Sequence, residues 1–130
     1  MNINIKTGID IIEVERIRNS IEKLGEKFLK EVYTDAEIEY CQNTKMMMYQ
    51  HYAARFAVKE ATFKAIWNIL DAKNSITWKN VETINDTNGK PHIKFVNVDE
   101  KILQKIESID VSISHIEKLA VANVTILVKD

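Results

Sequence analysis

Two charged side chains of the segment 52–67, YAARFAVKEATFKAIW, fall where an amphipathic helix would carry apolar ones. An α-helix turns about 100° per residue, and the segment has an apolar side at that spacing. Glu60 and Lys64 lie on this side, four residues apart, so their side chains are neighbours. A carboxylate and an ammonium that face a core either pair with each other or hold another charged group. The sequence leaves both interpretations open: a structural ion pair, or a site where Glu60 binds metal and Lys64 binds phosphate or helps to move a proton.

The rest of this predicted helix divides into two stripes. The stripe expected to face solvent holds His51, Arg55, Lys59 and Thr62. The stripe expected to face the core holds Ala53, Phe56, Ala57, Phe63 and Trp67. Because charged side chains are mostly exposed, we expect Arg55 and Lys59 only to keep the helix soluble.

Asp10 is the next candidate for chemistry. Residues 3–11 alternate isoleucine or threonine with polar residues and glycine, which predicts a half-buried strand. Gly8 leaves space on the face that carries Asp10. Asp10 is either an ordinary solvent-facing acid or a ligand for a hard divalent cation such as Mg²⁺, which prefers oxygen ligands. If the strand packs against the long helix, Asp10 and Glu60 make a reasonable pair of metal ligands.

A third group of polar residues ends the alternating segment Val111–His115. Ser112 and Ser114 share one predicted face just before His115, so hydroxyls and an imidazole could meet a phosphate there. The alternative is a structural histidine, which is more common at a strand end. No nucleophile-elbow glycines accompany these residues, and the sequence has neither a glycine-rich phosphate loop nor zinc-ligand spacing.

Composition restricts the class of protein. The chain has 130 residues, 45% of them hydrophobic, and a formal net charge of −1, which predicts one domain over 1–130 and argues against a generic nucleic-acid binder. A single cysteine, Cys41, allows no internal disulfide and suits a reducing compartment, where we expect it to be inert. No apolar run is long enough to span a bilayer. We therefore expect a cytoplasmic protein without a membrane segment.

Local patterns predict the elements that position these residues. A strand over 3–11 is followed by helices at about 13–24 and 26–32, and Thr34 with Glu37 has the spacing of a capping box. The long helix begins between Lys45 and Gln50, fades near Leu70 and is followed by a loop at 71–75. The remaining predicted elements are strands at 76–85 and 91–96 joined at Asn88-Gly89, a short helix capped by Asn97 through 106, and strands at 110–114 and 119–128. This order predicts an α+β fold, with a mainly antiparallel sheet packed on a long central helix.

Four stretches resemble one family when they are taken together. They occur in the same order and at similar separations as in holo-[acyl-carrier-protein] synthases, the short 4′-phosphopantetheinyl transferases: GIDIIEVERI at 8–17, ARFAVKEATFKAI at 54–66, NGKP at 88–91 and VSISHIEKLAVANV at 111–124. The resemblance implies transfer of phosphopantetheine from coenzyme A to a serine of apo acyl carrier protein, with release of 3′,5′-ADP.

The resemblance also implies roles for single residues. Asp10 and Glu60 match the family's Mg²⁺ ligands, and Lys64 and His115 match residues associated with the phosphates of coenzyme A. Arg16 matches an arginine that faces the acidic carrier protein. Short members resemble homotrimers with active sites between subunits, and the length of this chain matches theirs.

One departure from the family pattern leaves an alternative open. Members commonly have a glycine-rich turn after the Lys-Ala of the second motif, where this chain has Ile66-Trp67-Asn68-Ile69. Glycine lets the backbone approach a ligand closely, so the family pattern does not settle the local shape of the coenzyme pocket in this chain. The alternatives to the transferase are a non-catalytic relative that binds coenzyme A or a carrier protein, and a metal-dependent diphosphate hydrolase that uses the same carboxylates.

Overall fold

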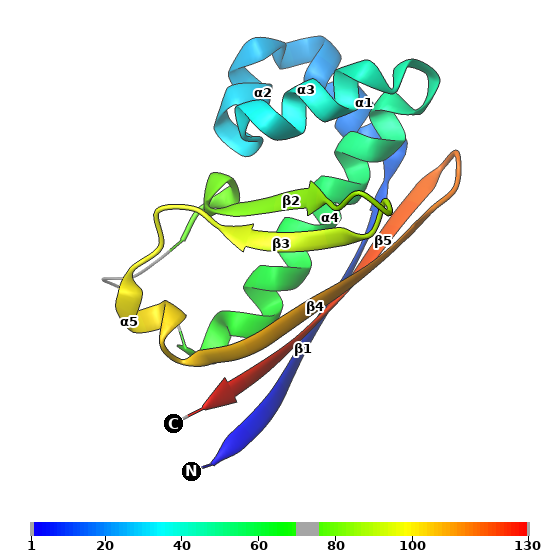
Figure 1. The fold of residues 1–130 in the computed structure, drawn as a ribbon. Helices are drawn as coiled ribbons and strands as arrows, with labels where there is room; N and C mark the ends of the chain where they lie inside the picture. Colours follow the sequence, from blue (N-terminus) through cyan, green and yellow to red (C-terminus); the bar gives the residue numbers. More distant parts are fainter. Residues whose placement is uncertain (1, 70–75, 130) are drawn as a thin grey trace.

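Residues from both ends of the chain build the main sheet. In the computed structural model, which describes residues 2–69 and 76–129, this sheet has the antiparallel order β1-β5-β4 and a separate hairpin joins β2 to β3 (Figure 1). The strands are β1 (Ile3–Glu13), β2 (Val81–Asn85), β3 (Pro91–Phe95), β4 (Ile106–His115) and β5 (Leu119–Lys129). The helices are α1 (Val14–Leu24), α2 (Glu26–Val32), α3 (Asp35–Asn43), α4 (Met48–Ile66) and α5 (Glu100–Leu103). The order of elements and the α+β class predicted from the sequence are confirmed.

The long helix α4 lies against one face of the sheet, with α1, α2 and α3 gathered at its N-terminal end (Figure 1). Small side chains allow close contact between helix and sheet: Ala57, Ala61 and Ala65 of α4 are buried with Ala122 and Val124 of β5. None of the helices in the part of the chain that the structure describes is long and apolar enough to cross a membrane.

Gly8 brings β1 directly onto α4. A Cβ atom at this position would lie 1.9 Å from the carbonyl oxygen of Ala61. The face of β1 that carries Gly8 and Asp10 is therefore the inner face, and the predicted packing of this strand on the long helix is confirmed. The expectation that Gly8 leaves space beside Asp10 is wrong, because the backbone of α4 fills that space.

The isoleucine face of β1 points away from α4. Ile3, Ile5, Ile9 and Ile11 are exposed, Ile9 to 59%. The predicted half-buried strand therefore has the opposite orientation in a single chain: the glycine-bearing face meets the helix, and the branched side chains remain uncovered.

The predicted phase of α4 is wrong on its polar side. Arg55, Lys59 and Thr62 are buried rather than exposed, because α3 and β2 cover this side of the helix. The Lys59 ammonium lies 2.8 Å from the Glu37 carboxylate of α3 and donates to the carbonyl oxygens of Trp78 and Val81, at 2.9 and 2.6 Å. In the stripe expected to face the core, Ala53 and Ala57 are buried as predicted, whereas Trp67 is 71% exposed.

Some of the predicted helix caps and element bounds are confirmed and others are wrong. Thr34 and Glu37 form the expected capping box at the start of α3. The predicted strand at 76–85 is shorter, because Trp78–Asn80 forms a 3₁₀ turn before β2 begins at Val81. Asp99, not Asn97, caps α5, which ends at Leu103. The loop predicted at 71–75 lies outside the described residues.

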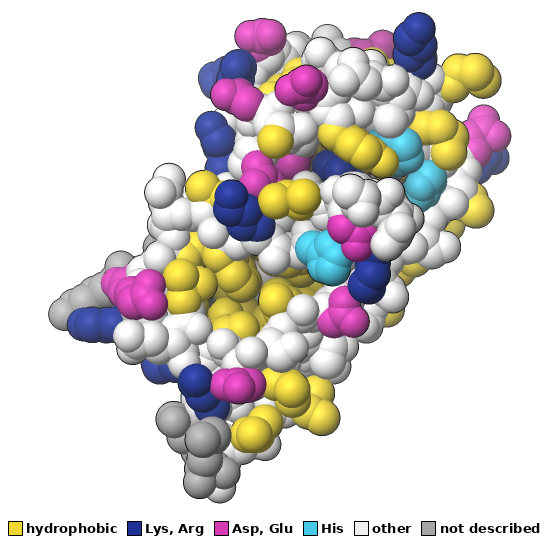
Figure 2. Space-filling model, in the orientation of Figure 1, with side chains coloured by type: hydrophobic (Ala, Val, Ile, Leu, Met, Phe, Trp, Pro, Cys, Tyr) yellow, Lys and Arg dark blue, Asp and Glu magenta, His cyan; other side chains and the backbone are white. Residues whose placement is uncertain are grey.

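Hydrophobic side chains fill the hollow between the β2–β3 hairpin and β4 (Figure 2). The half-buried isoleucines that pack on the core formed by α4, β4 and β5 include Ile93 of β3 and Ile106 and Ile109 of β4. The hairpin is thus tied to the sheet by apolar contacts, which place its Asn88-Gly89 turn near one end of β4.

Candidate active site

Lys64 brings Asp10 to the C-terminal half of α4. Its ammonium lies 3.2 Å from the Asp10 carboxylate and donates to the carbonyl oxygen of Ile9 at 2.8 Å. Lys64 thus pairs with Asp10. The ion pair between Glu60 and Lys64, which the sequence left open, is not found among the described residues. Glu60 is one turn before Lys64 on the same helix, so the two carboxylates flank one lysine.

Glu60 is half-buried and held from one side. The indole Nε1 of Trp78 donates to its Oε2 at 3.2 Å. Glu60, Phe63, Lys64, Trp67 and Asn68 line an open, mostly apolar pocket of about 510 Å³. The carboxylate and the ammonium thus stand at the border of a hollow large enough for part of an organic ligand.

A second, cationic pocket of about 240 Å³ involves the other half of α4. Its lining includes Tyr40, His51, Arg55, Gly89, Pro91 and His115. Arg55 is nearly fully buried, lies 4.0 Å above the ring of Tyr40 and donates to Asn85 at 2.8 Å. Its Nε has no hydrogen-bond partner among the described residues. A buried guanidinium with a spare donor, beside two imidazoles, is suited to an anion such as a phosphate.

The two histidines of this second pocket are fixed by separate partners. Nδ1 of His115 lies 2.7 Å from Oε1 of Gln50, and Nδ1 of His51 lies 2.9 Å from Oγ1 of Thr44. Their rings meet edge to face, with centroids 5.2 Å apart. Burial, then the neighbouring His115, then Arg55 lower the pKa of His51.

The two pockets open on opposite sides of α4. His51 and Glu60 are nine residues apart, which corresponds to about two and a half turns of the helix. The first pocket lies beside β1 through Asp10, whereas the second lies beside β4 through His115, and β5 separates these strands. Within one chain, Lys64 and His115 therefore do not form a single cluster.

Ser112 is not beside His115 in a single chain. Side chains of β4 alternate, so Val111, Ile113 and His115 share the inner face, and Ser112 and Ser114 are exposed on the other. The predicted inward orientation of Val111 and Ile113 is confirmed, whereas the grouping of Ser112 with His115 is wrong for one chain.

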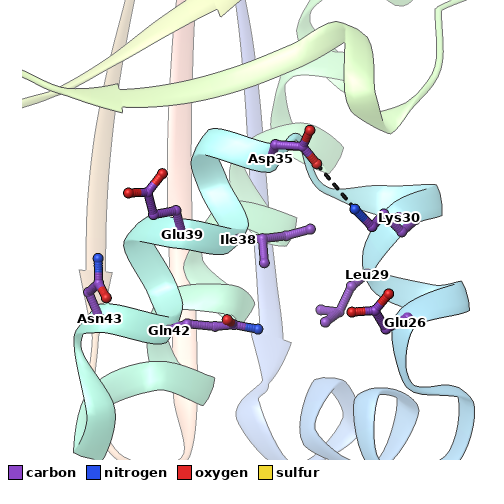
Figure 3. Close-up of a pocket in the computed structure, with 8 residues that line it drawn as sticks. All are labelled: Glu26, Leu29, Lys30, Asp35, Ile38, Glu39, Gln42 and Asn43. Carbon is purple, nitrogen blue, oxygen red and sulfur yellow. Dashed lines mark hydrogen bonds and ion pairs between the residues drawn. The ribbon is translucent and has the colours of Figure 1, made fainter.

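The other candidates are placed as follows. Arg16 is exposed on α1, where it is accessible to a partner. Cys41 is buried, and burial raises the pKa of its thiol to about 12, which agrees with an inert cysteine. A further pocket between α2 and α3 is lined by Glu26, Asp35 and Glu39 with Lys30, and Lys30 pairs with Asp35 at 3.4 Å (Figure 3). None of the predicted site residues lines it.

Residues 6–124, most of the chain, match the 4′-phosphopantetheinyl transferase superfamily. The chain belongs to this superfamily. It is 41% identical over 120 residues to a holo-[acyl-carrier-protein] synthase of Koribacter versatilis, a match that covers 91% of this chain and 94% of the relative. It is 43% identical over 119 residues to the synthase of Thermodesulfovibrio yellowstonii, covering 92% and 95%. The phosphopantetheinyl transferase predicted from the sequence is confirmed.

Solved structures of this superfamily share the fold. A holo-(acyl-carrier-protein) synthase of Bacillus anthracis in complex with CoA (3′,5′-ADP) is 30% identical, with a TM-score of 0.74 and coverage of 95% of this chain and 96% of that one. The Helicobacter pylori synthase in complex with coenzyme A is 28% identical, with a TM-score of 0.77 and coverage of 92% and 98%.

The four phosphopantetheinyl transferase motifs divide between the two pockets. Asp10 of the first motif pairs with Lys64 of the second, one turn after Glu60, whereas Arg55 of the second lines a pocket with the NGKP turn and His115. Three residues had no predicted role in the site: His51 and Arg55, which line the second pocket, and Trp78, which contacts Glu60 of the first. The first two were assigned to a solvent stripe. Trp78 belongs to no motif, and only the structure shows its contact with Glu60.

Proposed function

We propose that this phosphopantetheinyl transferase moves the 4′-phosphopantetheine group of coenzyme A to a serine of an apo acyl carrier protein at the border formed by Asp10, Glu60 and Lys64. The observation that carries the proposal is the convergence of Asp10 with Lys64, one turn from Glu60. These residues come from two motifs that are distant in the sequence. An assay with apo acyl carrier protein, coenzyme A and Mg²⁺, read by mass spectrometry, tests it directly.

The residues at this border suit Mg²⁺. Asp10 and Glu60 offer carboxylate oxygens, and the Asp10 carboxylate already pairs with the positive charge of Lys64. Magnesium is commonly held by one or two carboxylates together with phosphates and water, so two protein ligands suffice. When bound, Mg²⁺ would neutralise negative charge on a diphosphate. We assign Asp10 and Glu60 as its ligands.

The side chains of the chain have distinct tasks in this proposal. The Lys64 ammonium places a positive charge where the leaving 3′,5′-ADP gains negative charge. Glu60 or a water molecule accepts the proton of the attacking serine. Arg16, exposed on α1, meets the acidic surface of the carrier protein. His115, with Arg55 and His51, holds a phosphate of coenzyme A, and Ser112 contacts the coenzyme only across a subunit boundary.

We also propose that the active unit is a homotrimer with its sites between chains. The support is the separation of the two pockets on opposite sides of α4, together with the uncovered isoleucines of β1. A ligand that touches Lys64 of one chain would then touch His115 of a neighbour. Large exposed apolar faces commonly mark such interfaces.

Subunit complementation tests the shared site. Lys64→Ala and His115→Ala are each expected to be inactive. A trimer built from only one of these variants has no intact pair of Lys64 and His115. If the pair is formed between neighbours, unfolding and refolding the two variants together restores about one quarter of the wild-type sites, because random cyclic trimers contain one intact pair in three of four assemblies. Mixing without refolding is the control. No recovery after refolding to correctly assembled trimers would contradict the shared site.

Two outcomes separate the transferase from its alternatives. Glu60→Ala should abolish transfer and keep the circular dichroism spectrum, and unchanged transfer would reject its role. Tight coenzyme binding without any product would indicate a non-catalytic relative, whereas release of 3′,5′-ADP without carrier protein would indicate a hydrolase.

We place the enzyme in the cytoplasm, where its single buried cysteine stays reduced.

A further inference from the structure

We propose that Trp78 is a positioning residue for Glu60 and thereby sets the affinity of the proposed metal site; this rests on the proposed function. Its indole Nε1 donates to Oε2 of Glu60 at 3.2 Å, and both side chains are half-buried. A hydrogen bond to one oxygen limits rotation of the carboxylate and fixes the direction of the other oxygen. Groups that orient a metal ligand in this way change metal affinity by about 10- to 100-fold.

Trp78 is itself held in place by the residue next to Glu60. The buried Lys59 ammonium donates to the backbone carbonyl of Trp78 at 2.9 Å while it pairs with Glu37 at 2.8 Å. Two neighbouring residues of α4 therefore hydrogen-bond to Trp78: Lys59 to its backbone carbonyl and Glu60 to its indole. This closed arrangement fixes the ring relative to the helix.

The ring of Trp78 also has an apolar support. Phe56, one turn before Glu60 on α4, packs against it with ring centroids 6.1 Å apart and an interplanar angle of 31°. Phe56 thus supports one face of the indole, whereas the N–H group makes the hydrogen bond that orients the carboxylate. This separation of roles lets packing and hydrogen bonding be tested independently.

Trp78→Phe removes the N–H donor and keeps an aromatic ring, and Phe56→Leu is the matched control that weakens the packing and keeps the donor. The probe is Mn²⁺ binding to the folded protein, measured by electron paramagnetic resonance without coenzyme. We expect Trp78→Phe to weaken Mn²⁺ binding about 10-fold and Phe56→Leu to change it less than about twofold. In the transfer assay, Trp78→Phe should raise the KM for Mg²⁺ and leave kcat at saturating Mg²⁺ within about twofold.

A combination with Glu60→Gln distinguishes positioning from other effects. If Trp78 acts through the Glu60 carboxylate, the double variant binds Mn²⁺ no more weakly than Glu60→Gln alone, because coupled residues are not additive. An unchanged Mn²⁺ affinity in folded Trp78→Phe, or a full additional loss in the double variant, would overturn the role of Trp78. If Glu60→Gln itself leaves Mn²⁺ binding unchanged, the proposed metal site fails instead.

Discussion

The Lys64 ammonium and the Asp10 carboxylate form an ion pair, 3.2 Å apart, between residues 54 positions apart in the chain. The Lys64 side chain is 56% exposed, so the pair is open to solvent and weak. In the free protein, Lys64 pairs with the carboxylate of Asp10, which we assign as a metal ligand. Lysine and metal therefore compete for Asp10.

Lys64→Met should separate binding from catalysis. Without the competing ammonium, Mn²⁺ should bind up to about fivefold more tightly, because an exposed ion pair contributes at most about 1 kcal/mol. Transfer should nevertheless fall by about 100-fold or more, since the charge that stabilises the leaving group is lost. Lys30→Met, which breaks the exposed pair with Asp35, is the control and should change neither quantity. Weaker Mn²⁺ binding in Lys64→Met would contradict the competition.

Gly8→Ala should displace β1 from α4. The added methyl would lie 1.9 Å from the Ala61 carbonyl oxygen, a backbone atom that cannot rotate away. We expect the free energy of unfolding, from urea titration, to fall by about 1–3 kcal/mol, as for other overpacked cores. Mn²⁺ binding should weaken as well, because Asp10 is two residues further along the strand. Asn4→Ala, at an exposed position of β1, should leave both properties near wild type.

Lys59→Met should be far more damaging than loss of a surface charge. Lys59 and Glu37 are fully buried and paired at 2.8 Å, so removal of the lysine leaves a carboxylate without its counter-charge. Breaking a buried pair in this way costs about 3–5 kcal/mol. Lys90→Met, which breaks the exposed pair with Asp110, should cost less than about 1 kcal/mol. Partial recovery in Lys59→Met/Glu37→Leu would attribute the loss to the stranded carboxylate, and equal costs for the two single variants would refute it.

The same lysine shows where prediction from the sequence reaches its limit. Thr34 and Glu37 could be predicted as a capping box, because both partners of the motif lie within one turn. Lys59 was predicted to be exposed, because one-sided helix periodicity does not show that α3 and β2 cover a second side of α4. The buried ion pair joins residues 22 positions apart, and no local pattern encodes it.

The candidate site shows a similar division. The motifs predicted Asp10, Glu60, Lys64 and His115 as site residues, and the packing of β1 on α4 brings Asp10 to Lys64, one turn from Glu60. The sequence did not show that His115 lies on the other side of the helix with His51 and Arg55. It also did not show Trp78, because its contact with Glu60 depends on the 3₁₀ turn before β2.

His51 predicts how stability changes with pH. Burial, His115 and Arg55 lower its pKa in the folded protein below the usual value of about 6.5. The unfolded chain then binds the proton more readily, so the stability that neutral His51 permits is present above this value and decreases as pH falls through it. Thermal unfolding between pH 5 and 8 should show a lower midpoint at the acid end. His51→Gln should flatten this dependence and His92→Gln, at the exposed pair with Asp86, should not; equal slopes in His51→Gln and wild type would exclude the effect.

The exposed isoleucines of β1 predict the outcome of a charge placed among them. Ile9 is 59% exposed on the outer face of the main sheet, between Ile5 and Ile11. If this face joins subunits, Ile9→Asp buries an unpaired carboxylate at the interface. Light scattering should then give the mass of one chain for Ile9→Asp and the mass of three chains for the wild type. Transfer should fall with the trimer, because each chain then has only half of a site. Ile84→Asp is the matched control, since Ile84 is 40% exposed on β2 of the separate hairpin. A monomeric wild type, or an unchanged mass in Ile9→Asp, would show that this face is not the interface.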